Sequence, residues 1–156
     1  MDTLLFLNDN NINYRLIDHP PVYTVAESME HLPGKFPVKN LLLKEEKGDR
    51  CIFVIMKGDE RLDTKKLQEL TGCKKLQFAK PEVLMKKLSV EPGSASIFSL
   101  LHPGSDGVEV VIDERLISQD ELGFHPSSNT QTVFIAGQDV GTFLQYIHKT
   151  WLLIRV

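Results

Sequence analysis

Four short stretches of the sequence carry residue types that can bind or activate a substrate. Lys39 stands at the start of an apolar run, and a lysine amine there can hold a phosphate group. Gly93-Ser94-Ala95-Ser96 is a run of small residues, so a ligand can approach the backbone and accept hydrogen bonds from it. Gly123-Phe124-His125-Pro126 is followed by Asn129, and an imidazole with a carboxamide can orient a hydroxyl group or a water. The fourth stretch, His19-Pro20-Pro21-Val22-Tyr23-Thr24, could line a pocket.

Each of these stretches also has a purely structural interpretation. A lysine at the start of an apolar strand can extend its amine to solvent instead of lining a cleft. The small residues fit an ordinary loop, and turns commonly contain the residue types found around His125. The two prolines after His19 also fit a rigid corner. No single stretch therefore decides the function.

Several common catalytic motifs are missing from the sequence. There is no Gly-x-Gly-x-x-Gly, no phosphate-loop lysine and no Gly-x-Ser-x-Gly. The five histidines have no metal-ligand spacing with one another or with the two cysteines, and neither cysteine lies in a motif that would activate it. Cys51 begins an apolar run and is predicted to be a core residue. We therefore expect no metal and no cofactor, and a reaction that depends on positioning and electrostatics.

Composition places the chain among ordinary globular proteins. It has 156 residues, of which 42% are hydrophobic and 25% charged, so residues 1–156 are predicted to form one domain. The apolar runs are too short to cross a bilayer, and the first residues do not resemble a signal peptide. Two cysteines are too few for a disulfide framework. We therefore expect a cytoplasmic monomer without membrane contact.

Charge is distributed unevenly along the chain. Residues 35–87 carry a net charge of +6 and the remainder carries −9, which together give −3. Such a chain can present one basic face on an acidic body, enough to hold a few phosphates of a nucleic acid. The alternative is a set of lysine-rich helix and strand faces that contact only solvent.

The elements that must position these residues follow from capping signals and hydrophobic patterns. Two strands, residues 38–45 and 51–57, are separated by a linker typical of a hairpin turn. Their long apolar runs predict a sheet that is covered on both faces. Further helices are predicted at residues 3–10, 24–32, 64–70, 81–88 and 139–149, and further strands at 13–18, 75–79, 108–113 and 132–136. This order predicts an α+β domain with a mixed, mostly antiparallel sheet wrapped by short helices.

The order of the motifs resembles one known family. His19-Pro20-Pro21-Val22-Tyr23-Thr24, Lys39-Asn40-Leu41-Leu42-Leu43-Lys44, Gly93-Ser94-Ala95-Ser96 and Gly123-Phe124-His125-Pro126-x-x-Asn129-Thr130 follow one another along the chain, with Asp63-Thr64-Lys65-Lys66-Leu67 and Phe78-Ala79-Lys80-Pro81-Glu82 between them. In these motifs the chain resembles the YbaK/ProX family of trans-editing aminoacyl-tRNA deacylases, which are related to the editing domain of bacterial prolyl-tRNA synthetases. It is most similar to the free-standing ProX branch, which removes alanine mischarged onto proline tRNA.

The resemblance implies a cleft for the 3′ end of tRNA and a set of catalytic residues. Lys39 matches the family's essential lysine, which is thought to hold the terminal adenosine and its phosphate. Asn40 matches its neighbour in the ProX branch, and His125 matches the loop histidine beside the aminoacyl group. Gly93 opens the loop whose backbone faces the ester. The implied substrate-binding residues are Ser94, Ala95, Ser96, Pro20, Tyr23, Thr24, Lys44 and Asn129.

The family also implies a mechanism and partners. An aminoacyl ester is already activated, so its hydrolysis needs an aligned water and a stabilised oxyanion more than a protein nucleophile. The water is assisted by the substrate's ribose hydroxyl, and a small pocket admits alanine but excludes the proline ring. Many relatives carry proline where this chain has Ile97, so the choice among alanine, serine, cysteine and proline esters stays open. The implied partners are the acceptor end of tRNA, most specifically proline tRNA, and a transient contact with prolyl-tRNA synthetase.

Two alternatives remain at this point. A protein of the same fold could bind an aminoacyl-tRNA without cleaving it, as a sensor or regulatory module. An unrelated small-molecule hydrolase would need a nucleophile or a metal site, for which the sequence offers no motif. Loss of the ester in a deacylation assay separates the first alternative from an enzyme.

Overall fold

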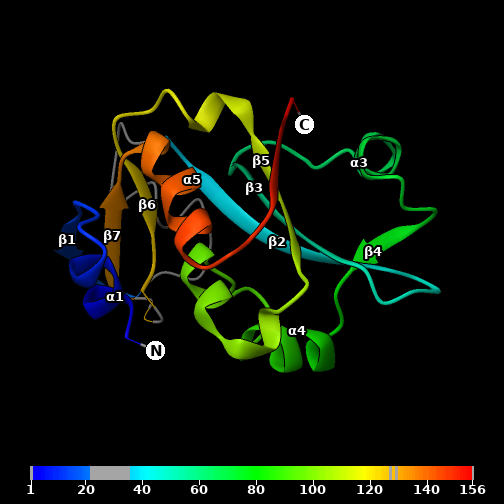
Figure 1. The fold of residues 1–156 in the computed structure, drawn as a ribbon, viewed down its shortest axis with the longest axis horizontal. Coiled ribbons are helices and arrows are strands. Elements are labelled where there is room, and N and C mark those ends of the chain that lie inside the picture. The colour runs from blue at the N-terminus through cyan, green and yellow to red at the C-terminus, as the bar shows by residue number, and fades with distance from the viewer. Residues whose placement is uncertain (1, 22–35, 127, 129, 156) are drawn as a thin grey trace.

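The computed structural model describes residues 2–21, 36–126, 128 and 130–155. Figure 1 shows two β-sheets with helices packed around them. The helices are α1 (Thr3–Asp9), α3 (Thr64–Thr71), α4 (Pro81–Leu88) and α5 (Gly137–Tyr146), with three 3₁₀ helices, η1 (Ile97–Leu101), η2 (Pro103–Ser105) and η3 (Glu114–Leu116). The strands are β1 (Arg15–Asp18), β2 (Val38–Glu45), β3 (Cys51–Lys57), β4 (Leu76–Phe78), β5 (Glu109–Asp113), β6 (Leu122–Phe124), β7 (Gln131–Ile135) and β8 (Trp151–Ile154).

The strands form a larger mixed sheet and a smaller antiparallel one. The larger sheet has the order β4-β2-β3-β5-β8, in which β5 pairs in parallel with β3 and β8 while β2 pairs antiparallel with β3 and β4. The smaller sheet has the order β1-β7-β6. A parallel bridge between Phe36 and Leu122 links the two sheets. The predicted α+β class and the mostly antiparallel pairing are confirmed, but the single predicted sheet is in fact two.

The larger sheet is covered on both faces, as the apolar runs of β2 and β3 predicted. Successive side chains of a strand point to opposite faces, so neighbours on β3 enter different hydrophobic clusters. Phe53 and Ile55 belong to the main core, which also contains Phe143 of α5 and Phe98 of η1. The main core uses Leu42 of β2, whereas the second cluster uses Leu43 of β2, Ile52, Val54 and Met56 of β3, and Leu67 of α3. Fully burying each such side chain contributes about 1.5–3 kcal/mol, which fixes the register of β2.

Local signals set most element boundaries where they were predicted. Strands 38–45 and 51–57 are confirmed as β2 and β3. The carboxylate of Asp63 accepts from the Lys66 amide as the N-cap of α3, and Gly72 ends that helix with a φ of 76°. Pro81 begins α4. These caps position the loops that flank the larger sheet.

Other predictions need correction. Strands β6 and β8 were not predicted, and α5 begins two residues earlier and ends three residues earlier than the predicted helix 139–149. The helix predicted at 24–32 lies outside the described residues.

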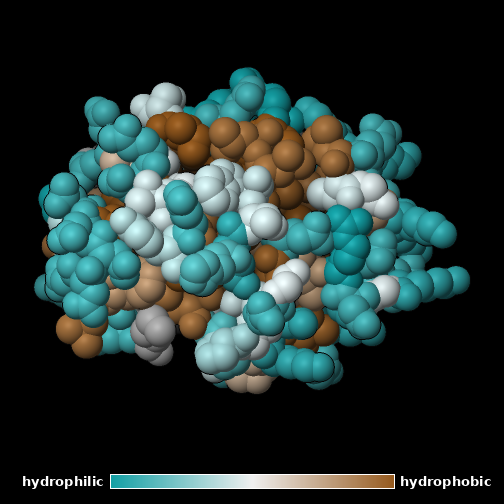
Figure 2. All heavy atoms as spheres, in the orientation of Figure 1, coloured by the Kyte–Doolittle hydropathy of each residue, from teal (hydrophilic) through white to brown (hydrophobic). Residues whose placement is uncertain are grey.

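Figure 2 shows an apolar patch over β8, where Leu152 and Leu153 are exposed at the sheet edge. Within the described part of the chain, no helix is long and apolar enough to span a membrane.

Candidate functional site

Among the described residues, no strand pairs with the first half of β2 along its outer edge, which we call the free edge of β2. β4 pairs only with Leu43–Glu45 of β2, and the last backbone contact on this side joins the Ala79 amide to the Leu42 carbonyl. At the other end, the bridge at Phe36 joins the chain to β6. Residues 38–41 therefore lie in a gap between β4 and β6 that no described strand fills. A ligand that reaches this edge meets side chains from both faces of β2.

Lys39 is half-buried near the start of this free edge. Strand alternation places it on the same face as Leu41 and Leu43, and its Nζ donates to the backbone carbonyl of Glu60, in the loop after β3. Among the described residues, its amine forms no ion pair. An ammonium group has three protons, and within the part of the chain that the structure describes only one of them has an acceptor, so two can bind a phosphate.

Asn40 points to the opposite face of β2. Its Oδ1 atom is buried, and it has no hydrogen-bond partner among the described residues. Because a buried carbonyl without a partner costs about 1–3 kcal/mol, such atoms are rare in folded proteins. This oxygen is available to accept a hydrogen bond from a ligand hydroxyl or amine.

His125 lies directly after β6, beside the same edge. Lys39 and His125 each lie three residues beyond the parallel bridge between Phe36 and Leu122, and β2 and β6 contact one another. The bridge and these contacts place the start of β2 beside β6, the strand that His125 follows. The His125 ring is partly buried and forms a hydrogen bond with the backbone of Ala95, so the structure joins two of the predicted segments here.

Some backbone amides of the glycine loop, residues 93–96, already form hydrogen bonds within the protein. Gly93 has a φ of 82°, which favours glycine, and it is exposed. The Ser94 amide donates to the Glu91 carbonyl at 3.0 Å, and the Ser96 amide donates to Ser99 Oγ at 3.0 Å. Two of the four N–H groups in this run are therefore already engaged within the protein. Within the described residues, only the Gly93 and Ala95 amides of this run lack a partner.

Ser96 and Ile97 have structural roles at the start of η1. The buried Ser96 hydroxyl accepts from the Phe98 amide and forms a capping box with Ser99. Ile97, which stands where many relatives have proline, is fully buried in the main core. Its side chain therefore packs in the interior instead of lining a surface pocket.

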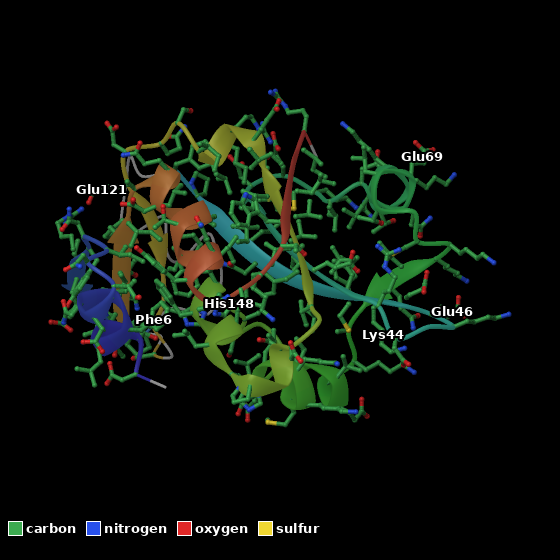
Figure 3. The ribbon with its side chains drawn as sticks, in the orientation of Figure 1. Phe6, Lys44, Glu46, Glu69, Glu121 and His148 are labelled. Atoms are coloured by element: carbon green, nitrogen blue, oxygen red, sulfur yellow. The ribbon has the colours of Figure 1, made fainter. Side chains whose placement is uncertain are left out.

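The remaining predicted substrate-binding residues are spread out. Pro20 is exposed just after β1, and its carbonyl contacts the His19 ring, which also bonds Thr132 at 2.7 Å. The Lys44 amine donates to the carbonyls of Glu45 and Gly48, at 3.1 and 2.6 Å, and so holds the β2–β3 turn. Figure 3 shows Lys44 near β4, far from Glu121 beside β6. Tyr23, Thr24 and Asn129 lie outside the described residues.

Sequence reasoning missed a group of charged residues that is connected to Lys39 through Glu60. The Arg115 guanidinium donates to both Glu60 and Asp113, and Asp113 is fully buried at the end of β5. These hydrogen bonds raise the pKa of Arg115 and lower the pKa of Glu60. The run Asp113-Glu114-Arg115 at the end of a buried strand was the available signal, since charged residues there must find partners.

The burial of His125 leads to a prediction about pH. Desolvation lowers its pKa below the ordinary 6.5, although the Ala95 hydrogen bond opposes this effect. The unfolded chain therefore binds more protons as pH falls through 6.5, so stability present above that pH is lost below it. One proton contributes a slope of at most about 1.4 kcal/mol per pH unit. Urea unfolding from pH 8 to 5 should show a smaller loss in His125→Asn than in wild type, and parallel curves would contradict this.

Comparisons with known proteins show which proteins this chain resembles. The aminoacyl-tRNA editing domain family matches residues 19–143. The chain is 37% identical to the prolyl-tRNA editing protein ProX of Acetoanaerobium sticklandii, over 96% of this chain and 93% of the relative. It is 31% identical to the prolyl-tRNA synthetase associated domain-containing protein 1 of Danio rerio, over 96% and 83%. A solved structure of a proposed trans-editing enzyme for prolyl-tRNA synthetase has a TM-score of 0.72 at 18% identity, over 94% and 90%.

The shared fold and the sequence match differ in how specific they are. The two-sheet α+β architecture is the fold of that solved trans-editing structure. The sequence match, which covers most of the chain, is more specific than the fold. This chain belongs to the aminoacyl-tRNA editing domain family.

Proposed function

We propose that the protein hydrolyses the ester of mischarged tRNA, with alanine on proline tRNA as its substrate. Its relative in A. sticklandii is called a prolyl-tRNA editing protein, and that similarity extends over nearly the whole of both chains. The observation that carries the proposal is the free edge of β2, where Lys39 and Asn40 lie beside the chain that leads from the Phe36–Leu122 bridge to His125. A tRNA 3′ end is a single strand, which can enter such an edge without duplex opening.

In this proposal Lys39 and Asn40 hold the end of the tRNA. One proton of the Lys39 amine is used by the Glu60 carbonyl, and the others bind a phosphate of the acceptor end. The unpartnered Oδ1 of Asn40 accepts a hydrogen bond from a ribose hydroxyl. Bound substrate thus satisfies a buried oxygen that has no partner among the described residues, which favours binding of a hydroxyl at that position.

The reaction itself is the addition of water to an activated ester. The water oxygen attacks the carbonyl carbon, helped by the neighbouring ribose hydroxyl of the substrate, and the esterified ribose oxygen leaves with a proton. The amides of Gly93 and Ala95, which have no partner among the described residues, donate to the developing oxyanion. The lowered pKa of His125 keeps its ring neutral at pH 7, so it orients the aminoacyl group through hydrogen bonds and adds no charge.

Discrimination in this proposal depends on size. A pocket closed against the proline ring admits alanine, because binding of one or two methylene groups discriminates by only about 1–3 kcal/mol each and exclusion is more effective. A relative of this chain is named for association with prolyl-tRNA synthetase. We therefore include a transient contact with that enzyme, which would deliver the mischarged tRNA.

A panel of charged tRNAs tests the function and the substrate together. Proline tRNA is charged separately with alanine, serine, cysteine and proline, and correct alanyl-tRNA is the fifth substrate. We expect the fastest ester loss with alanine on proline tRNA and little loss with either correctly charged tRNA. Equal rates on all five would contradict the size rule, and no ester loss on any would contradict the enzyme.

One observation favours a second candidate, a binder that does not cleave. The amides of Ser94 and Ser96 are engaged within the protein, so the glycine loop has fewer donors for an oxyanion than the sequence suggested. Single-turnover assays with excess protein separate the two candidates. A binder retains the ester in a stoichiometric complex, whereas the enzyme releases the amino acid at a rate above the uncatalysed one.

A further inference from the structure

The amine of Lys39 is held by a carbonyl whose own position is set by other residues. Glu60, which provides this carbonyl, lies in the loop between β3 and α3. Two backbone contacts tie this loop locally: the Gly58 amide donates to the Pro37 carbonyl at 2.8 Å, and the Glu60 amide donates to the Lys57 carbonyl at 3.3 Å. Both contacts involve only backbone atoms, so the Glu60 side chain can bind a different partner.

The side chain of Glu60 is anchored by Arg115. The guanidinium binds the carboxylate in a bidentate way, with Nη1 donating to Oε1 at 2.8 Å and Nη2 to Oε2. Bidentate pairs of this kind fix orientation as well as distance. Because Glu60 is anchored at both its backbone and its side chain, its carbonyl has a defined direction toward Lys39.

Arg115 is in turn fixed by a buried acid. The Asp113 carboxylate, with none of its surface exposed, accepts from Arg115 Nε at 3.0 Å and from Nη2 at 2.5 Å. The same carboxylate accepts from the Arg115 amide at 3.0 Å, so it also caps η3. Since Asp113 ends β5, which is paired on both sides by β3 and β8, the connection runs from an interior strand to the amine of Lys39.

We propose that Asp113 and Arg115 are positioning residues for Lys39, acting through Glu60. This inference rests on the proposed function, because it gives Lys39 the role of phosphate ligand. The connection runs from the Asp113 carboxylate through the Arg115 guanidinium to Glu60, whose backbone carbonyl accepts from the Lys39 amine. Neither residue touches the substrate in this scheme.

The test compares Arg115→Gln with a matched control, Arg50→Gln. Arg50 also forms a bidentate pair, with Glu109 at 2.8 and 2.9 Å, and it connects the residue before β3 to the start of β5, at the other end of these two strands. The first readout is the rate of reductive methylation of Lys39, measured by mass spectrometry of its peptide. We expect a severalfold faster reaction of Lys39 in Arg115→Gln and no change in Arg50→Gln.

The second readout is deacylation of alanine on proline tRNA. Arg115→Gln should lower kcat/KM by about 10- to 100-fold, mainly through KM, because a displaced ligand weakens binding of the phosphate. Arg115→Lys should recover part of the loss, since one amine can bind Glu60 but not both carboxylates in the bidentate geometry. If Arg115→Gln fails to fold, Glu60→Gln replaces it, because that side chain is exposed and its carbonyl is retained.

The two readouts distinguish the possible failures. Unchanged methylation of Lys39 would overturn the positioning inference, whatever the activity. Faster methylation with normal kcat/KM would overturn its functional part. If wild-type protein deacylates none of the tRNAs, the proposed function fails, and the methylation rates still decide whether Arg115 holds Lys39.

Discussion

Lys39→Ala should lower kcat/KM for deacylation by about 100- to 1000-fold, the largest effect on activity that we expect. The variant loses the proposed pair between the Lys39 amine and a phosphate of the tRNA. Loss of one member of a partly buried, hydrogen-bonded charge pair costs about 2–5 kcal/mol, and about 1.4 kcal/mol changes a rate tenfold. The fold should be unaffected, because the lysine amine donates to the Glu60 carbonyl, and water can replace the amine as the donor to that oxygen. Circular dichroism and single-turnover deacylation of alanine on proline tRNA measure the two effects.

Lys75→Ala is the control for this prediction. Lys75 is exposed and pairs with Glu46 beside the β2–β3 turn, away from the free edge of β2. Its removal changes the net charge by the same amount as Lys39→Ala but leaves the proposed site intact. We expect at most a small, salt-dependent decrease in activity. Equal losses for the two variants would show that general charge, and not the position of Lys39, determines the rate.

The sequence predicted best those elements whose signals are local. The boundaries of β2 and β3 follow from long apolar runs around a turn, and Asp63, Gly72 and Pro81 mark helix ends by capping chemistry. Burial of Cys51, whose pKa is raised by desolvation, also follows from its place at the start of an apolar run. Local interactions dominate at all these positions.

The missed strands depend on contacts that are distant in sequence. Strand β6 has three residues, too few to show a period of two, and it exists because it pairs with β7. Strand β8 pairs in parallel with β5, about forty residues earlier, and three of its four residues are exposed. An exposed edge strand has no alternating hydrophobic pattern from which it could be predicted. The division into two sheets follows from these long-range pairings.

For the site, the sequence was enough to select candidate residues but not to predict their contacts. Lys39, Asn40 and His125 could be selected from the sequence because their motifs occur in a recognisable order. The hydrogen bonds of the Ser94 and Ser96 amides could not be predicted from the sequence, because they depend on where Glu91 and Ser99 lie. The link from Asp113 to Lys39 joins three separate segments and is visible only once β3 and β5 are adjacent. The roles of the selected residues in catalysis stay predictions for the assays above.

The largest expected effect on stability is that of Asp113→Ala. Removing one member of a buried ion pair typically costs about 3–5 kcal/mol, because the remaining charge is left without compensation. Arg115 keeps Glu60 as a partner, so we expect the lower end of this range, about 3 kcal/mol in the free energy of unfolding. Loss of the carboxylate that caps η3 acts in the same direction. Urea unfolding at pH 7 measures the change.

Glu109→Ala is the matched control, since Glu109 and Asp113 occupy the two ends of the same strand and each binds an arginine. The difference between them is burial: the Glu109 side chain is 40% exposed and that of Asp113 is fully buried. An exposed pair contributes at most about 1 kcal/mol, because water screens it and solvates the charge that remains. Similar losses in the two variants would mean that Arg115 is not held by a desolvated carboxylate, and the buried end of the connection to Lys39 would be missing.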